Sequence, residues 1–255
     1  MISLTNMNNR NNQGEKLYQQ ALGEAKSDPY ILGLFLVAGR GKGFATEHSD
    51  YDLFIIVNDE KAEEYKENYQ KLKIANVFDP FVFSLSAFKN YAEMGSEFEW
   101  DRYNFAHIKA EVDKGGVQEL IDAKGILPND KIEKVVEDQL DGYINLYYRS
   151  IKNHRDDNLF ASRLDAAESI PYLLTALFAI NGRVRPYNKY LKWELQNYPL
   201  KITSWATEEF LETITAVAFS GDIEIQKKLF NSVKELFTKN NFTKSIDGWS
   251  GYYLG

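Results

Sequence analysis

The sequence contains no cysteine, and this absence excludes disulfides and thiolate metal sites. It has only three histidines, and they are too widely separated to show a metal-ligand spacing, so carboxylates are the expected metal ligands. A chain without cysteine is compatible with the reducing conditions of the cytoplasm, where we expect this protein to reside.

Long apolar runs are also missing. No stretch reaches the roughly 18 to 20 uninterrupted apolar residues that a membrane-spanning helix needs. The longest candidate, residues 170–180, is interrupted by Pro171, Tyr172 and Thr175 and predicts a buried helix instead. Residues 1–13 are rich in asparagine and lack an apolar core, so we expect a mobile segment there and no signal peptide.

An excess of positive charge is absent, since the formal net charge is −7. Proteins that bind nucleic acids usually carry a basic stripe, because neutralising phosphates dominates their affinity. Here lysines and glutamates alternate along the expected helical faces. The composition therefore favours a neutral or cationic small molecule as partner, and neither a nucleic acid nor a membrane.

The residues that are present predict an α+β protein with two domains. Hydrophobic residues make up 44% of the chain, enough for a sizeable core. Strands are predicted over 30–38, 51–57 and 74–85, and helices over 13–25 and 61–71. Ser86 is expected to cap a short helix, and residues 97–108 to form another. Pro80 removes a backbone donor, so the third strand is expected at a sheet edge or at a bulge.

The pattern changes after Pro128. Almost everything from there to Lys239 has helical periodicity, with helices expected over 130–154, 158–180, 187–197, 207–219 and 222–238. We therefore place a domain boundary at this proline. Residues 1–128 are predicted to form a mixed sheet with flanking helices, and residues 129–255 a helical bundle.

One segment carries most of the functional information. Residues 38–49 form a glycine-rich turn, and Asp50 and Asp52 then open the apolar strand 51–57. Residues i and i+2 of a strand point to the same face, so these two carboxylates can share a divalent cation. Glycines let backbone N–H groups approach an anion, so the turn can hold phosphates. The combination predicts metal-assisted transfer from a nucleoside triphosphate.

This segment resembles the signature of the DNA polymerase beta-like nucleotidyltransferase superfamily, Gly-Ser-x-Ala-x-Gly-x5-Ser-Asp-x-Asp. Without gaps, Ala38 and Gly39 take the positions of Gly and Ser, and Gly41 and Gly43 those of Ala and the second Gly. Residues 49–52 match Ser-Asp-x-Asp. The opening pair departs from the pattern, because the family's serine hydroxyl helps to hold the triphosphate.

The resemblance, strongest over residues 31–57, implies a small-molecule nucleotidyltransferase similar to the aminoglycoside and lincosamide resistance enzymes. Such an enzyme moves a nucleoside monophosphate, here AMP from ATP, onto a hydroxyl of a small acceptor molecule. An aminoglycoside-like antibiotic is one example of such an acceptor, and it is cationic. The resemblance also implies Mg²⁺ on Asp50 and Asp52, and a helical domain that closes the acceptor pocket. The expected nucleotide-binding residues are Gly39, Arg40, Gly41, Lys42, Gly43, Ser49 and Lys189.

The family also has a third carboxylate on a neighbouring strand, which binds metal or takes the proton from the acceptor hydroxyl. Asp79 matches this position best, and its alternative role is that of a polar residue at a strand edge. Glu99 and Asp101 are further candidates, since both lie in an aromatic segment.

Several features admit a structural role instead. Lys189 is as compatible with a solvated surface as with a nucleotide, and Arg183 and Arg185 fit helix ends. Aromatic residues at helical spacing, such as Tyr143, Tyr147 and Tyr148, indicate core more often than a ligand platform. Asp165 and Glu168 share a helical face and suit either solvent or an ammonium group.

Two other function classes stay open. The altered Ala38-Gly39 pair favours a protein that binds nucleotide, or a partner in a toxin–antitoxin pair, without turnover. Arg149 and His154 match the Arg-x4-His pattern of HEPN-type ribonucleases, a short pattern that often arises by chance.

Overall fold

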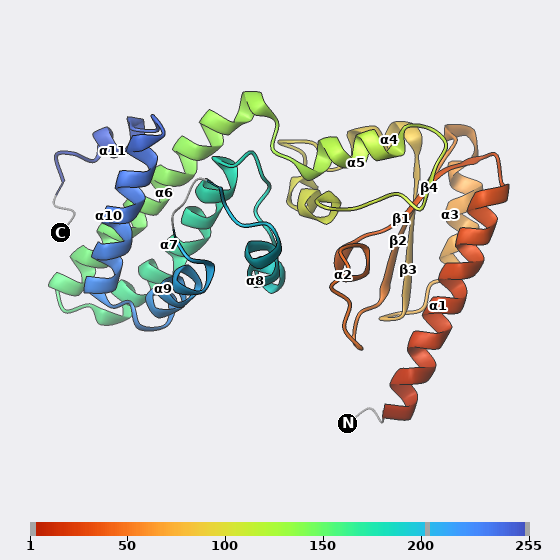
Figure 1. Cartoon of the computed structure of the whole chain (residues 1–255), viewed down its shortest axis with the longest axis horizontal. Helices are drawn as coiled ribbons and strands as arrows, with labels where there is room; N and C mark the ends of the chain where they lie inside the picture. The colour runs from red at the N-terminus through yellow and green to blue at the C-terminus, as the bar shows by residue number, and fades with distance from the viewer. Residues whose placement is uncertain (1–3, 202–204, 253–255) are drawn as a thin grey trace. The chain divides into compact units, whose positions relative to one another are not determined.

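The computed structural model describes residues 4–201 and 205–252 and divides the chain into two units, Met1–Ile126 and Leu127–Gly255 (Figure 1). The first unit holds the strands described below, and the second is helical. The chain is therefore an α+β protein with an N-terminal mixed sheet and a C-terminal helical region. None of the described helices is both long and apolar enough to cross a membrane.

The first unit is built around a sheet with the strand order β3-β2-β1-β4. β2 runs antiparallel to β1 and parallel to β3, while β4 pairs antiparallel with β1. Its elements are α1 (Leu4–Ser27), β1 (Ile31–Leu36), α2 (Ala38–Gly41), β2 (Tyr51–Val57), η1 (Asp59–Lys61), α3 (Ala62–Gln70), β3 (Phe78–Ser84), α4 (Leu85–Asn90), η2 (Glu99–Phe105), β4 (Val112–Asp113) and α5 (Val117–Gly125).

The central strand β2 is apolar on both faces because helices cover both. Leu53, Ile55 and Val57 pack into a cluster with α1 and α3. Phe54 and Ile56 pack on the opposite face with residues of α4, η2 and α5. The two layers lie on either side of the sheet in Figure 1. This double coverage explains the continuous apolar run that marked the strand in the sequence.

The second unit consists of helices α6 (Asn129–Arg155), α7 (Leu159–Ala179), α8 (Asn188–Asn197), α9 (Thr207–Ser220), α10 (Ile223–Lys239) and α11 (Lys244–Gly248). Five of the predicted helices are confirmed, with ends that shift by one or two residues. The long pair α6 and α7 forms the centre, where Leu173, Leu177 and Phe178 are fully buried. Gly221 ends α9 in a left-handed conformation, as a helix C-cap often requires.

Several local predictions were wrong. The first helix was expected to begin at residue 13 but begins at Leu4, and Asn11 on that helix donates to the carbonyl of Glu47 at 3.2 Å. The cap of α4 is Ser84, whose Oγ accepts from the N–H of Ala87, because Ser86 bonds to Asp59 instead. The helix expected over 97–108 is the shorter 3₁₀ segment η2, and α5 and α11 were not predicted.

Candidate functional site

The predicted carboxylates lie together at one edge of the sheet. Asp50 directly precedes β2 and Asp52 is its second residue, so strand alternation favours one face for both side chains. In the parallel pair, Asp52 is aligned with Asp79 of β3. Phe54 of β2 packs against Phe81 of β3 with ring centroids 5.3 Å apart, so residues 52 and 79 share the face of this aromatic pair. The fold thus brings all three carboxylates to the same region.

Asp79 has a partner that the sequence did not reveal. The ammonium of Lys73, from the turn before β3, lies 2.7 Å from Asp79 Oδ1. The same ammonium lies 5.9 Å from the centroid of the Phe81 ring, which places it on the face of the three carboxylates. Nothing in a surface segment rich in lysine and glutamate singles this lysine out. Asp79 is therefore neutralised by a cation from its own chain.

The donor set fits Mg²⁺ in a limited way. No group of three or more histidine, cysteine, aspartate or glutamate side chains stands in metal-binding geometry within the described residues. Mg²⁺ usually takes one or two protein carboxylates and completes its octahedron with waters and substrate phosphates. Asp50 and Asp52, both half-buried on one face, meet that smaller requirement.

The turn after β1 is a single helical turn, α2, rather than an open loop. The N–H groups of Gly41 and Gly43 donate to the carbonyls of Val37 and Arg40, at 3.1 and 3.2 Å. These two amides are therefore engaged inside the turn and are not directed at a ligand, contrary to the predicted role. The N–H of Gly39 belongs to the start of the helical turn, where intrahelical acceptors are lacking.

Conformation and packing explain much of the glycine pattern. A Cβ on Gly41 would lie 2.1 Å from the carbonyl oxygen of Leu36, so only glycine fits there. Ala38 has a φ of 52°, in the left-handed region that glycine adopts without strain. A glycine at this position would therefore relieve backbone strain.

The two cations of the turn make contacts within the protein. Arg40 donates from Nε to the carbonyl of Asp50 at 3.0 Å and from a terminal nitrogen to the carbonyl of Ser49 at 2.8 Å. Its guanidinium carbon lies 3.7 Å from the centroid of the Tyr51 ring. Arg40 therefore fixes the backbone that carries Asp50, a positioning role rather than the predicted phosphate contact.

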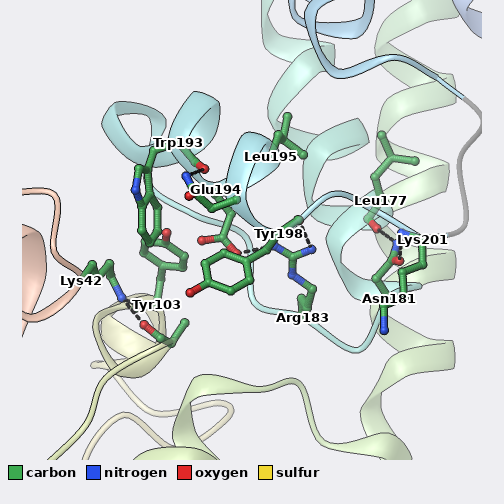
Figure 2. Close-up of polar contacts among 12 residues, drawn as sticks. Lys42, Tyr103, Leu177, Asn181, Arg183, Trp193, Glu194, Leu195, Tyr198 and Lys201 are labelled. Atoms are coloured by element: carbon green, nitrogen blue, oxygen red, sulfur yellow. Dashed lines mark hydrogen bonds and ion pairs between the residues drawn. The ribbon is translucent and has the colours of Figure 1, made fainter.

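Lys42 is 7% exposed, and its ammonium faces the carboxyl end of η2. It donates to the carbonyls of Tyr103 at 2.9 Å and Asn104 at 3.4 Å, and also to that of Ala106 (Figure 2). In this structure Lys42 joins α2 to η2 instead of reaching outward to phosphate.

Ser49 closes the end of the turn. Its Oγ accepts from the N–H of Thr46 at 2.9 Å, and its own N–H donates to the carbonyl of Thr46 at 3.1 Å. The hydroxyl is thus used locally to shape the entry into β2.

Tyr51 anchors the same strand end on the opposite face. Its hydroxyl donates to Glu15 of α1 at 2.5 Å, and its ring stacks on Tyr18 with a centroid separation of 5.8 Å. The hydrogen bond lowers the pKa of the Glu15 carboxyl. Burial, followed by the bond to Glu15, raises the pKa of Tyr51 to about 12. Since Tyr51 lies between Asp50 and Asp52 in the sequence, its contacts with α1 fix the backbone from which both carboxylates extend.

The further carboxylate candidates have structural contacts. Glu99 accepts from the N–H of Gly95 at 2.7 Å, and buried Asp101 accepts from the hydroxyl of Tyr91 at 2.8 Å and from Asn104. Sequence reasoning also missed two buried cations that bind carbonyls. Arg102 donates to Ala92, Ala123 and Ile126, and Lys124 donates to Lys89 and Tyr91. Together with Lys42 they stabilise the layer over the carboxylate face.

In the second unit, Arg183 donates to the carbonyl of Tyr198 at 2.7 Å and to the buried carboxylate of Glu194 (Figure 2). Arg185 donates to Asn188 at 2.8 Å. Lys189 is exposed, with its ammonium 4.7 Å from the centroid of the Tyr190 ring. The role of Lys189 toward a nucleotide stays a prediction.

Other residues singled out in the helical unit are largely structural. Tyr143 and Tyr147 are buried, and Tyr147 stacks on Phe230 at 4.5 Å, which confirms the core interpretation. Asp165 is 4% exposed, not solvated, and pairs with Arg149 at 3.1 Å. His154 is exposed. Because the guanidinium of Arg149 forms an ion pair with Asp165, nothing in this geometry favours the ribonuclease interpretation.

No family model and no curated protein matches the sequence. Among solved structures, the chain is similar to the crystal structure of a nucleotidyltransferase-like protein from Exiguobacterium sibiricum 255-15, with a TM-score of 0.38 and 8% identity. The alignment covers 90% of this chain and 79% of that one. The assignment of the site therefore rests on the residues described above.

Proposed function

We propose that this protein is a cytoplasmic, Mg²⁺-dependent nucleotidyltransferase that transfers AMP from ATP to a hydroxyl of a small molecule. One observation carries the proposal. Asp50 and Asp52 stand two residues apart at the start of β2, directly after the glycine-containing turn, and Asp79 is aligned beside Asp52. An acidic protein without a basic stripe suits a neutral or cationic acceptor, with an aminoglycoside-like antibiotic as one example.

Each carboxylate has a distinct task in this proposal. Asp50 and Asp52 hold the cation, which supplies charge neutralisation at the phosphate oxygens. Asp79 accepts the proton of the acceptor hydroxyl. The hydroxyl oxygen of the acceptor then forms the bond to the α-phosphorus as the bond between that phosphorus and pyrophosphate breaks. The products are the adenylylated acceptor and pyrophosphate. Arg40 and Tyr51 keep the start of β2 in place for both carboxylates.

Calorimetric titration of ATP with and without Mg²⁺ tests the binding half of the proposal. We expect Asp50→Asn and Asp52→Asn to weaken Mg²⁺-dependent binding by about tenfold or more, because each variant removes a metal-ligating charge. Asp138→Asn is the matched control, since Asp138 is an exposed carboxylate of α6. Unchanged, metal-dependent ATP binding in both site variants would show that the site is wrong.

A specific observation favours a second candidate, a nucleotide-binding protein without turnover. The turn lacks the family's serine hydroxyl, and its two cations contact protein carbonyls. A screen for pyrophosphate release over hydroxylated amines separates the two candidates. Binding of ATP without acceptor-dependent pyrophosphate release would support the second.

A further inference from the structure

The contact between Lys73 and Asp79 differs from an ordinary surface ion pair. Asp79 Oδ1 is buried from solvent, and no described residue gives it a hydrogen bond of good geometry. Its charge is balanced by the Lys73 ammonium at 2.7 Å. The interaction is therefore mainly electrostatic, without the directed bonds that usually stabilise a shielded carboxylate oxygen.

The position of this oxygen gives the contact its meaning. Asp79 is aligned with Asp52 across the parallel strands, on the face that also carries Asp50. A divalent cation near these residues brings twice the charge of an ammonium and needs no hydrogen-bond geometry. The side chain of Lys73 is 40% exposed, so its ammonium can leave the Asp79 carboxylate and be solvated by water instead.

We propose that Lys73 is a positioning residue that holds the Asp79 carboxylate in the metal-free protein and is displaced from it when a divalent cation binds. The inference rests on the proposed function and adds a form of regulation to the same site. Lys73 opposes the charge of a bound cation at Asp79, so the carboxylate that the proposed function uses as proton acceptor leaves the ammonium only when Asp50 and Asp52 hold a cation. The ammonium also prevents three carboxylates from repelling one another in the empty site.

The competition predicts a measurable gain of metal affinity when the lysine charge is removed. Mn²⁺ is the probe, and its free fraction is followed by electron paramagnetic resonance without nucleotide. We expect Lys73→Met to bind Mn²⁺ about two- to fivefold more tightly than the parent, the range set by the loss of one partly exposed ion pair. Lys73→Arg keeps the charge and should retain the parent affinity.

Matched variants identify the source of the gain. Lys71→Met removes an exposed lysine two residues away, whose ammonium contacts Asn68 at 3.5 Å, and should change nothing. In the double variant Lys73→Met/Asp79→Asn the gain should disappear, because the freed carboxylate is its cause. Urea unfolding of each variant verifies that the fold persists.

The possible failures are distinguishable. If the parent binds Mn²⁺ through Asp50 and Asp52 but Lys73→Met binds it no more tightly, Lys73 is not a competitor and the inference is overturned alone. If neither the parent nor Lys73→Met binds Mn²⁺ without nucleotide, the inference is overturned, while the proposed function is judged separately by the Mg²⁺-dependent titration of ATP, in which substrate phosphates complete the ligands of the metal. A gain that survives Asp79→Asn would also overturn the role given to Lys73.

Discussion

Substituting Gly14 by alanine should destabilise the protein, although alanine is the better helix former. Gly14 is an interior residue of α1 and faces the ring of Tyr51. A Cβ there would lie 2.6 Å from one ring carbon and 3.1 Å from the carbonyl oxygen of Val77. Normal carbon–carbon contacts are about 3.5 to 4.0 Å, so ring or helix must move. The ring is confined by Glu15, Tyr18 and Arg40.

The same helix provides the control. Gly23 is exposed, and a Cβ on it would meet nothing within 4 Å. Gly23→Ala should therefore stabilise the protein by about 1 kcal/mol, the helix-propensity difference. Gly14→Ala gains the same helix propensity, but its added methyl group crowds the Tyr51 ring, and such overpacking lowers stability by about 1 to 3 kcal/mol. We expect Gly14→Ala to be less stable than Gly23→Ala by about 1 to 3 kcal/mol.

Urea unfolding followed by far-UV circular dichroism measures both free energies of unfolding. A second expectation concerns the site, because any shift of Tyr51 moves Asp50 and Asp52 on either side of it. Gly14→Ala should weaken Mg²⁺-dependent ATP binding, whereas Gly23→Ala should leave it unchanged. Equal stability of the two variants would refute the close approach of α1 to Tyr51.

Two further outcomes follow from the strand end and the turn. Ala38→Gly should stabilise the protein by about 1 kcal/mol in urea unfolding, since alanine is strained at φ 52°; a loss of stability would contradict that conformation. Tyr51→Phe removes the hydrogen bond that lowers the pKa of Glu15 below 4.5. The bond's contribution is present above pH 4.5 and is lost as pH falls through the folded pKa. The stability gap between parent and Tyr51→Phe should therefore shrink in acid, and a gap independent of pH would exclude this linkage.

The main architecture could be predicted because its signals are local. The apolar run 53–57 and the helical periodicity after Pro128 result from burial that repeats along the chain. The spacing of Asp50 and Asp52 predicts a shared face from strand geometry alone. Asp79 was one candidate for a carboxylate on a neighbouring strand, and the parallel register of β2 and β3 aligns it with Asp52.

What the sequence could not predict depends on contacts between distant residues. Arg40 and Lys42 look like phosphate ligands because they flank glycines, yet their acceptors are carbonyls at residues 49–50 and 103–106. The ion pair of Lys73 depends on how the turn before β3 folds back. A left-handed Ala38 has no signature in composition. These contacts and this backbone angle are set by tertiary packing, so the residues next to them in the sequence do not predict them.

The outermost strand of the sheet also bears on strand pairing between molecules. β3 pairs with β2 on one side, and on its other side Ile74 bridges Phe78, beyond which no described strand pairs with it. Pro80 has no N–H to offer, and the charged Lys73 lies against Asp79 next to it. Both features are typical of edges that resist intermolecular strand pairing. The segment that carries Asp79 therefore also has the features of a protected sheet edge.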